Sequence, residues 1–137
     1  MDDLSRTVVE AAVEVQSHLG SGLLRSAYEA CLYHELGLRG LKVERNLPVN
    51  LVHREQLILS NKQVPLIVEN TLMVACHCME KMQPLHLAKA RSLLKISSAE
   101  TGLCISFHSS NLAGQIKRIA LQTGDFTPRE VGEKQEL

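Results

Sequence analysis

The chain has 137 residues, of which 45% are hydrophobic and 22% are charged, with 15 basic and 15 acidic residues. This composition is typical of one globular domain, and the net charge of zero excludes a general positive field for nucleic acid, so that such binding would need a local patch. No apolar run is long enough to span a membrane and the first residues do not resemble a secretory signal, so we expect a cytoplasmic protein with reduced cysteines.

Two amphipathic helices are predicted at the start of the chain. Apolar residues recur at helical spacing over residues 3–19, and Gly20 ends this helix. A second apolar stripe covers residues 23–38 and ends before Gly40. Because the linker at residues 20–22 is short, the two helices should pack as neighbours.

The spacing of apolar residues changes from helical to alternating at Leu41. Residues 41–51 are predicted to form the first strand, and Pro48 within it indicates a sheet edge or a bulge. Residues 53–56 are polar and predict a turn of the chain.

The middle of the chain predicts the centre of the sheet. A second strand begins at residues 57–59, is interrupted by polar residues 60–63, and continues through residues 64–68. A turn around Asn70 connects it to a third strand at residues 72–78. Because the runs on either side of this turn are apolar on both faces, they favour a central antiparallel hairpin.

The last part of the chain predicts one more helix and two more strands. The helix covers residues 84–96, and the strands cover residues 103–107 and 115–121. Residues 125–137 form a polar tail, so we predict a single domain over residues 1–124. The order of helix, helix, three antiparallel strands, helix, strand, strand fits an α/β sandwich.

Several motifs along the chain occur in a familiar order. The segment Gly22-Leu-Leu-Arg-Ser-Ala-Tyr28 resembles the G-x-x-E-x-x-Y motif that names the GxxExxY proteins, a branch of the PD-(D/E)xK nuclease superfamily. The other matching segments are Glu35 to Gly40, Leu47 to Val49, Val68 to Asn70, Leu85-His86, Gly102-Leu103 and Ile116 to Arg118. The resemblance implies a restriction-endonuclease-like α/β core of helix, three-stranded antiparallel meander, helix and strand, here with an extra N-terminal helix.

The resemblance also implies where the catalytic residues of an active relative would lie. Active relatives hold Mg²⁺ with carboxylates and use a lysine beside the attacking water. The residues that stand at these positions here are Arg25 for the helix acid, Pro65 for the aspartate, Ala75 for the glutamate, His77 for the lysine, and Lys89 and Leu93 for a later Q-x-x-x-Y pattern. We therefore expect no catalytic residue, no Mg²⁺ and no nuclease activity by this mechanism.

The sequence leaves several candidates for other roles at this site. His77 and His86 are candidates for a transition-metal pair, while the cysteines beside His77 face the other way on the strand and are interpreted as buried apolar residues. Tyr28 is interpreted as a packing residue with a satisfied hydroxyl. The nearby acids that could replace the lost carboxylates are Glu69, Glu80 and Glu100.

Three basic residues, Arg25, Lys89 and Arg91, are candidate contacts to a phosphate or to a nucleic-acid backbone. Arg25 and Lys89 both stand at motif positions and should therefore lie near one another. Aromatic residues make up only 3% of the chain, which leaves few platforms for base stacking.

The sequence favours a non-catalytic nuclease-fold protein that acts as a structural or protein-interaction subunit and self-associates. Strand edges near Pro48 and residues 115–121, together with helix 3–19, are candidate surfaces for a homo-oligomer or another protein partner. The alternative is a nucleic-acid or phosphate-binding module, and a residual metal-dependent nuclease is the third hypothesis.

Overall fold

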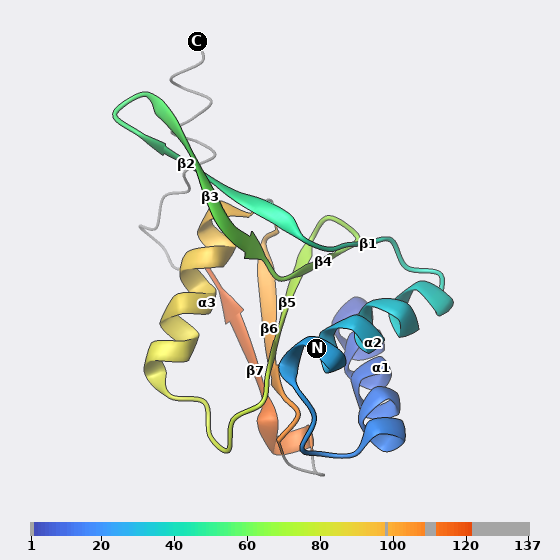
Figure 1. The fold of residues 1–137 in the computed structure, drawn as a ribbon. Helices are drawn as coiled ribbons and strands as arrows, with labels where there is room; N and C mark the ends of the chain where they lie inside the picture. Colours follow the sequence, from blue (N-terminus) through green and yellow to red (C-terminus); the bar gives the residue numbers. More distant parts are fainter. Residues whose placement is uncertain (1, 98, 109–111, 122–137) are drawn as a thin grey trace.

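The computed structural model describes residues 2–97, 99–108 and 112–121, so the predicted tail at residues 125–137 lies outside the described residues. Figure 1 shows the helices near the N-terminus on one side of a central sheet and the helix drawn in yellow on the other. The helices are α1 (Asp3–Leu19), α2 (Arg25–Leu38) and α3 (Pro84–Ile96), with a short 3₁₀ helix at Leu112–Gln115. None of the helices in these ranges combines the length and the apolar character needed to cross a membrane.

The main sheet has five strands in the order β1-β4-β5-β6-β7. Their bounds are Val43–Glu44 for β1, Leu66–Val68 for β4, Leu72–His77 for β5, Thr101–Ser106 for β6 and Ile116–Ala120 for β7. Strands β1, β4 and β5 form an antiparallel meander, β6 runs parallel to β5, and β7 is antiparallel to β6. Because α3 connects the parallel pair, the order is that of the predicted restriction-endonuclease-like core. The predicted α/β fold class is confirmed.

A separate two-stranded hairpin is inserted between β1 and β4. It consists of β2 (Leu47–His53) and β3 (Gln56–Val64), and Figure 1 shows it projecting beyond the main sheet. The turn residues Arg54 and Glu55 both have positive φ, as a tight hairpin turn requires. The register shifts between Pro48 and Asn50, so the predicted bulge is confirmed.

Two details of the predicted strands are wrong. The first strand does not run through residues 41–51, because Asn46 adopts a positive φ of 64° and divides it into β1 and β2. Residues 60–63 do not interrupt the second strand, since they belong to β3 and Gln63 pairs with Pro48. Pairing with β2 therefore outweighs the low strand propensity of these polar residues.

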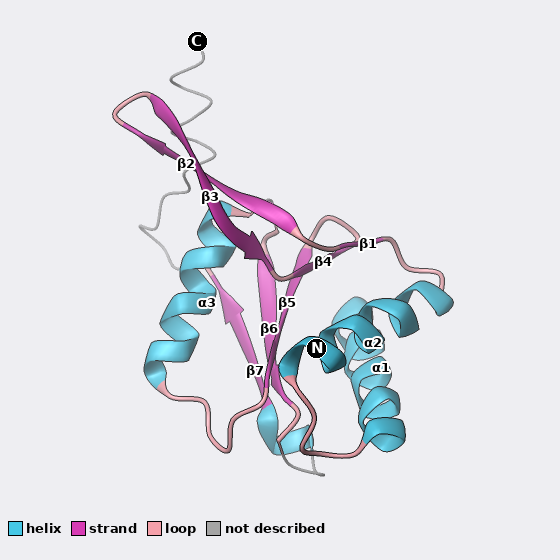
Figure 2. Ribbon diagram, in the orientation of Figure 1, coloured by secondary structure: helices cyan, strands magenta, loops and turns pink. Residues whose placement is uncertain are grey.

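The two faces of the main sheet carry two separate cores, and Figure 2 shows helices lying on either side of the strands. One set of strand residues packs with α1 and α2, namely Leu66, Val68, Val74, Cys76, Leu103 and Ile105. The alternate set packs with α3, namely Ile67, Met73, Ala75, Cys104 and Ile119. Helices cover both faces, which explains why the central strands are apolar at successive positions.

The apolar face of helix α1 is buried inside the protein. Its buried residues are Ser5, Val8, Ala11, Ala12, Val15 and Gln16. The Gln16 side-chain amide donates a hydrogen bond to the backbone carbonyl of Phe107 at 3.2 Å, which joins the helix to the end of β6. The prediction that this helix offers an apolar surface for assembly is therefore wrong, because its apolar stripe already packs on the sheet.

Tyr28 connects α2 to both the sheet and the loop before it. Its ring stacks on Phe107, with centroids 4.6 Å apart and planes inclined by 9°. Its hydroxyl donates to the Gly20 carbonyl at 2.5 Å and accepts from the Leu23 N–H at 3.2 Å. The interpretation of Tyr28 as a packing residue with a satisfied hydroxyl is confirmed.

Candidate functional site

Strands β4 and β5 pair only up to the first residue of β4, so the last part of β5 has no paired neighbour on that side among the described residues. The β4–β5 ladder ends at the pair Leu66 and Val74, and the following β5 residues 75–77 pair only with β6. Pro65 lies directly before β4, and proline has no backbone N–H with which to extend the ladder. A cavity of about 250 Å³ lies beside this open stretch of β5.

Three elements and the residue before β4 bring side chains to this cavity. Its lining residues are Arg25 and Glu29 from α2, Pro65 before β4, Ala75, Cys76 and His77 from β5, and His86, Lys89, Ala90 and Leu93 from α3. All six motif positions that the resemblance singled out lie in this set, so the predicted proximity of Arg25 and Lys89 is confirmed. Arg91 is not in the set, because it lies two residues beyond Lys89 and therefore on a different side of α3.

The two histidines of the cavity come from different elements. The ring centroids of His77 and His86 are 6.4 Å apart. The backbone N–H of Gln83 donates to His86 Nδ1 at 2.9 Å, so the neutral His86 ring carries its proton on Nε2. His77 Nε2 is buried and has no hydrogen-bond partner among the described residues. Burial lowers the pKa of His77, with smaller effects from His86 and Arg25, so we expect a neutral imidazole at neutral pH.

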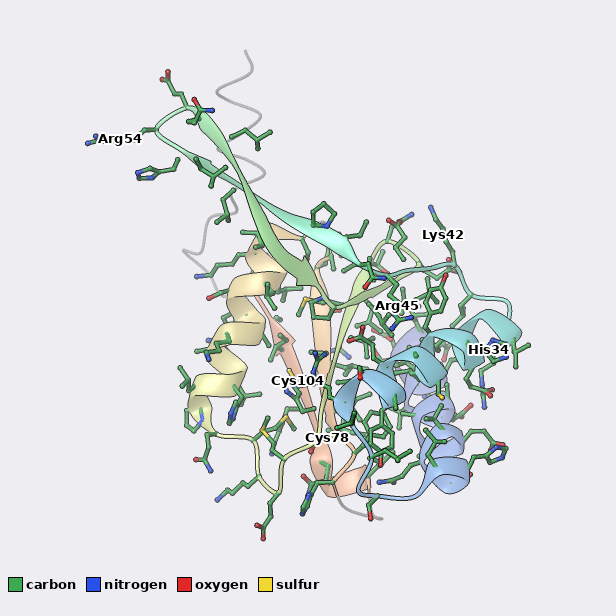
Figure 3. All side chains as sticks on the ribbon, in the orientation of Figure 1. His34, Lys42, Arg45, Arg54, Cys78 and Cys104 are labelled. Atoms are coloured by element: carbon green, nitrogen blue, oxygen red, sulfur yellow. The ribbon has the colours of Figure 1, made fainter. Side chains whose placement is uncertain are left out.

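Glu29 is an acid that the sequence reasoning did not identify. Its side chain is only 15% exposed and forms ion pairs with Arg25 Nη1 at 3.2 Å and with Arg45 Nε at 3.6 Å. Arg45 in turn lies over the ring of Tyr33, 5.8 Å from its centroid, and Figure 3 shows it beside α2. Glu29 follows Arg25 by four residues, a spacing that places the two side chains on one face of a helix and could have indicated the pair.

The residues present do not fit a magnesium ion. Pro65 and Ala75 have no side-chain oxygen, and among the lining residues Glu29 is the one carboxylate and is shared by two guanidinium groups. Within residues 2–97, 99–108 and 112–121, no group of three histidine, cysteine, aspartate or glutamate side chains is arranged to hold a metal ion. The acids Glu69, Glu80 and Glu100 do not line the cavity.

The cysteines beside His77 belong to the opposite face of the sheet. Cys76 is buried and packs in the core under α1 and α2, and Cys78 packs against the same core. Burial raises the pKa of the Cys76 thiol, and it raises the pKa of the Cys104 thiol to about 11. Protonated thiols in apolar surroundings are poor nucleophiles and poor metal ligands.

The element order and the sheet topology are those of a restriction-endonuclease-like α/β protein. The family model of the PD-(D/E)XK nuclease superfamily matches residues 2–119, and the chain belongs to this superfamily. No curated protein and no solved structure gave a match.

Proposed function

We propose that this chain is a catalytically degenerate member of its superfamily, of the GxxExxY type, and that it acts as a non-catalytic structural or protein-interaction subunit that self-associates. The proposed loss of catalysis rests on one observation. Pro65 and Ala75, which lie where β4 and β5 stop pairing, have no side-chain oxygen. Metal-dependent phosphodiester hydrolysis needs carboxylates there to position the cation and the water.

The charge of the cavity also supports the proposal that no catalytic metal ion binds here. Arg25 and Lys89 bring positive charge to a place where a divalent cation would have to lie. The carboxylate of Glu29 already forms two ion pairs, and breaking them to bind a metal ion would remove the carboxylate partner of Arg45, whose side chain is only 31% exposed. A cation of the Mg²⁺ type therefore gains too little from this site to replace its own water shell.

DNA cleavage tests the loss of catalysis. Supercoiled DNA incubated with the purified protein and Mg²⁺ or Mn²⁺ should be cut no faster than with a mock preparation, because nothing in the cavity positions a metal-bound water. A mock preparation from the same host controls for contaminating nucleases. Cutting that follows this protein through purification and is abolished by Glu29→Gln would contradict the proposal.

The β2–β3 hairpin is the surface that favours self-association. It projects from the body of the protein, and its exposed apolar side chains include Leu51, Leu57 and Ile58, with exposed fractions of 37%, 55% and 43%. Leu51 pairs with Ile58 across the ribbon, whereas Leu57 lies one position along and points to the opposite face. A two-stranded ribbon with apolar residues on both faces is marginally stable until something covers it.

A second copy of the chain is the occupant that we propose for this hairpin. The tip carries Arg54, labelled in Figure 3, and next to it Glu55, so one hairpin is complementary in charge to another related to it by two-fold symmetry. Both outer strand edges of the ribbon can also pair with the same edge of a copy. We expect the mass in solution to be twice that of one chain, as measured by light scattering.

A further inference from the structure

The cavity beside β5 presents two cationic side chains from opposite helices. Arg25 reaches it from α2, and its side chain is 59% exposed in spite of the ion pair with Glu29. Lys89 reaches it from α3 and forms no ion pair with the residues that the structure describes. An anion that entered the cavity would therefore contact positive charge from both sides.

The two histidines add hydrogen-bonding nitrogens to the same cavity. Because His86 Nδ1 accepts the Gln83 N–H, its Nε2–H remains as a donor in the neutral ring. His77 Nε2 is buried without a partner in the described part of the chain. A buried nitrogen in this state is uncommon and is typical of a position that a ligand or a water occupies.

We infer that this cavity binds a phosphate group, either as inorganic phosphate or as a terminal phosphate monoester, through Arg25, Lys89, His77 and His86. Phosphate oxygens accept the charge-assisted hydrogen bonds that guanidinium and ammonium groups donate. The inference rests on the proposed loss of the metal site, because the phosphate is held here by side chains alone and is not cut.

The donors that line the cavity match a phosphate monoester better than a phosphodiester. Arg25 and Lys89 bring two positive charges to the lining and Glu29 removes one, while Arg45, which pairs with Glu29, does not line the cavity. A phosphate monoester carries about 1.5 to 2 negative charges at pH 7 and has three free oxygens. A phosphodiester inside a nucleic-acid strand carries a single negative charge and has two free oxygens, so it uses fewer of the donors.

The lining also indicates that the phosphate alone is recognised. No phenylalanine, tyrosine or tryptophan belongs to the lining set, so a nucleobase would find no aromatic ring on which to stack. The net charge of the chain is zero, so phosphate binding depends on the local cluster and not on a general positive field. The volume of about 250 Å³ is sufficient for a phosphate with its nearest waters.

Calorimetric titration with inorganic phosphate tests the inference. We expect saturable binding of one phosphate per chain at neutral pH, and at least a tenfold loss of affinity in Arg25→Gln and in Lys89→Met, because each variant removes a charged donor. Lys81→Met is the matched control, since Lys81 is also an exposed lysine near α3 but does not line the cavity. Its affinity should equal that of the wild type.

Two oligonucleotides of one sequence distinguish the sources of the phosphate group. If the ligand is a nucleic-acid end, the oligonucleotide with a 5′-phosphate displaces inorganic phosphate and its 5′-hydroxyl counterpart does not. If the ligand is free phosphate, neither of them displaces it. No saturable phosphate binding, or binding that Arg25→Gln and Lys89→Met leave unchanged, would overturn the inference.

The failure of this inference can be told apart from the failure of the proposed function. Absence of phosphate binding together with absence of DNA cleavage would reject the phosphate site and leave the non-catalytic function standing. Metal-dependent cleavage would reject the proposed function, whatever the phosphate titration shows. Circular dichroism of each variant confirms that both comparisons are made on folded protein.

Discussion

Replacing Phe107 by alanine should lower the free energy of unfolding by about 3–5 kcal/mol, the largest stability effect that we expect from one substitution. The side chain is fully buried at the end of β6 and stacks on Tyr28. Removing the ring leaves a cavity between the sheet and helices α1 and α2, and it also removes an aromatic pair worth about 0.5–1.5 kcal/mol. Urea unfolding followed by circular dichroism measures the change.

The backbone of Phe107 makes this substitution easy to interpret. Its carbonyl accepts from Gln16 and its N–H donates to the His77 carbonyl at 2.9 Å, and neither bond involves the side chain. Phe107→Leu keeps most of the apolar volume and should cost clearly less than the alanine variant. Equal stability of Phe107→Ala and the wild type would show that α1 and α2 do not pack on the sheet in this way.

If the chain forms the proposed dimer, the hairpin variant Leu57→Lys with Ile58→Lys should convert it to a monomer, with at least a hundredfold weaker association. The two side chains point to opposite faces of the ribbon, so the double variant places charge on both. Each leucine or isoleucine that is buried in an interface contributes about 1.5–3 kcal/mol, and a two-fold interface buries each of them twice. Sedimentation velocity over a range of concentrations measures the dissociation constant.

Leu38→Lys is the matched control for the hairpin. Leu38 is 69% exposed but lies at the end of α2, in the body of the protein. Its substitution should leave the proposed dimer intact, and all variants should melt close to the wild-type temperature because the changed residues are exposed. A wild-type protein that remains monomeric at high concentration would contradict the proposed self-association.

The order of the motifs in the sequence was sufficient to predict the location of the cavity. Arg25, Ala75 and Lys89 are separated by many residues, and their proximity followed from the resemblance alone, because the order of helices and strands fixes where each motif position lies. The fold class could be predicted for the same reason, since helical and alternating periods follow one another along the chain in the order of the core elements.

The features that could not be predicted from the sequence depend on tertiary contacts. Residues 60–63 are polar, and they form a strand because β2 lies beside them. Glu29 was missed because an acid on a helix surface is ordinary until Arg25 and Arg45 are seen to lie on either side of it. The apolar stripe of α1 is the same pattern whether a helix packs on its own sheet or on a partner, and only the fold shows which surface it covers.

Titration of the protein with Mn²⁺, followed by the loss of the free-ion electron paramagnetic resonance signal, tests the central claim most directly. That claim is our proposal that the cavity lacks the side-chain oxygens that would hold a metal ion, at Pro65 and Ala75, while Arg25 and Lys89 line it with positive charge. We predict no saturable Mn²⁺ binding at millimolar concentration, because Pro65 and Ala75 offer no ligand and Glu29 is held by two arginines. One tightly bound Mn²⁺ per chain that Glu29→Gln abolishes would contradict it.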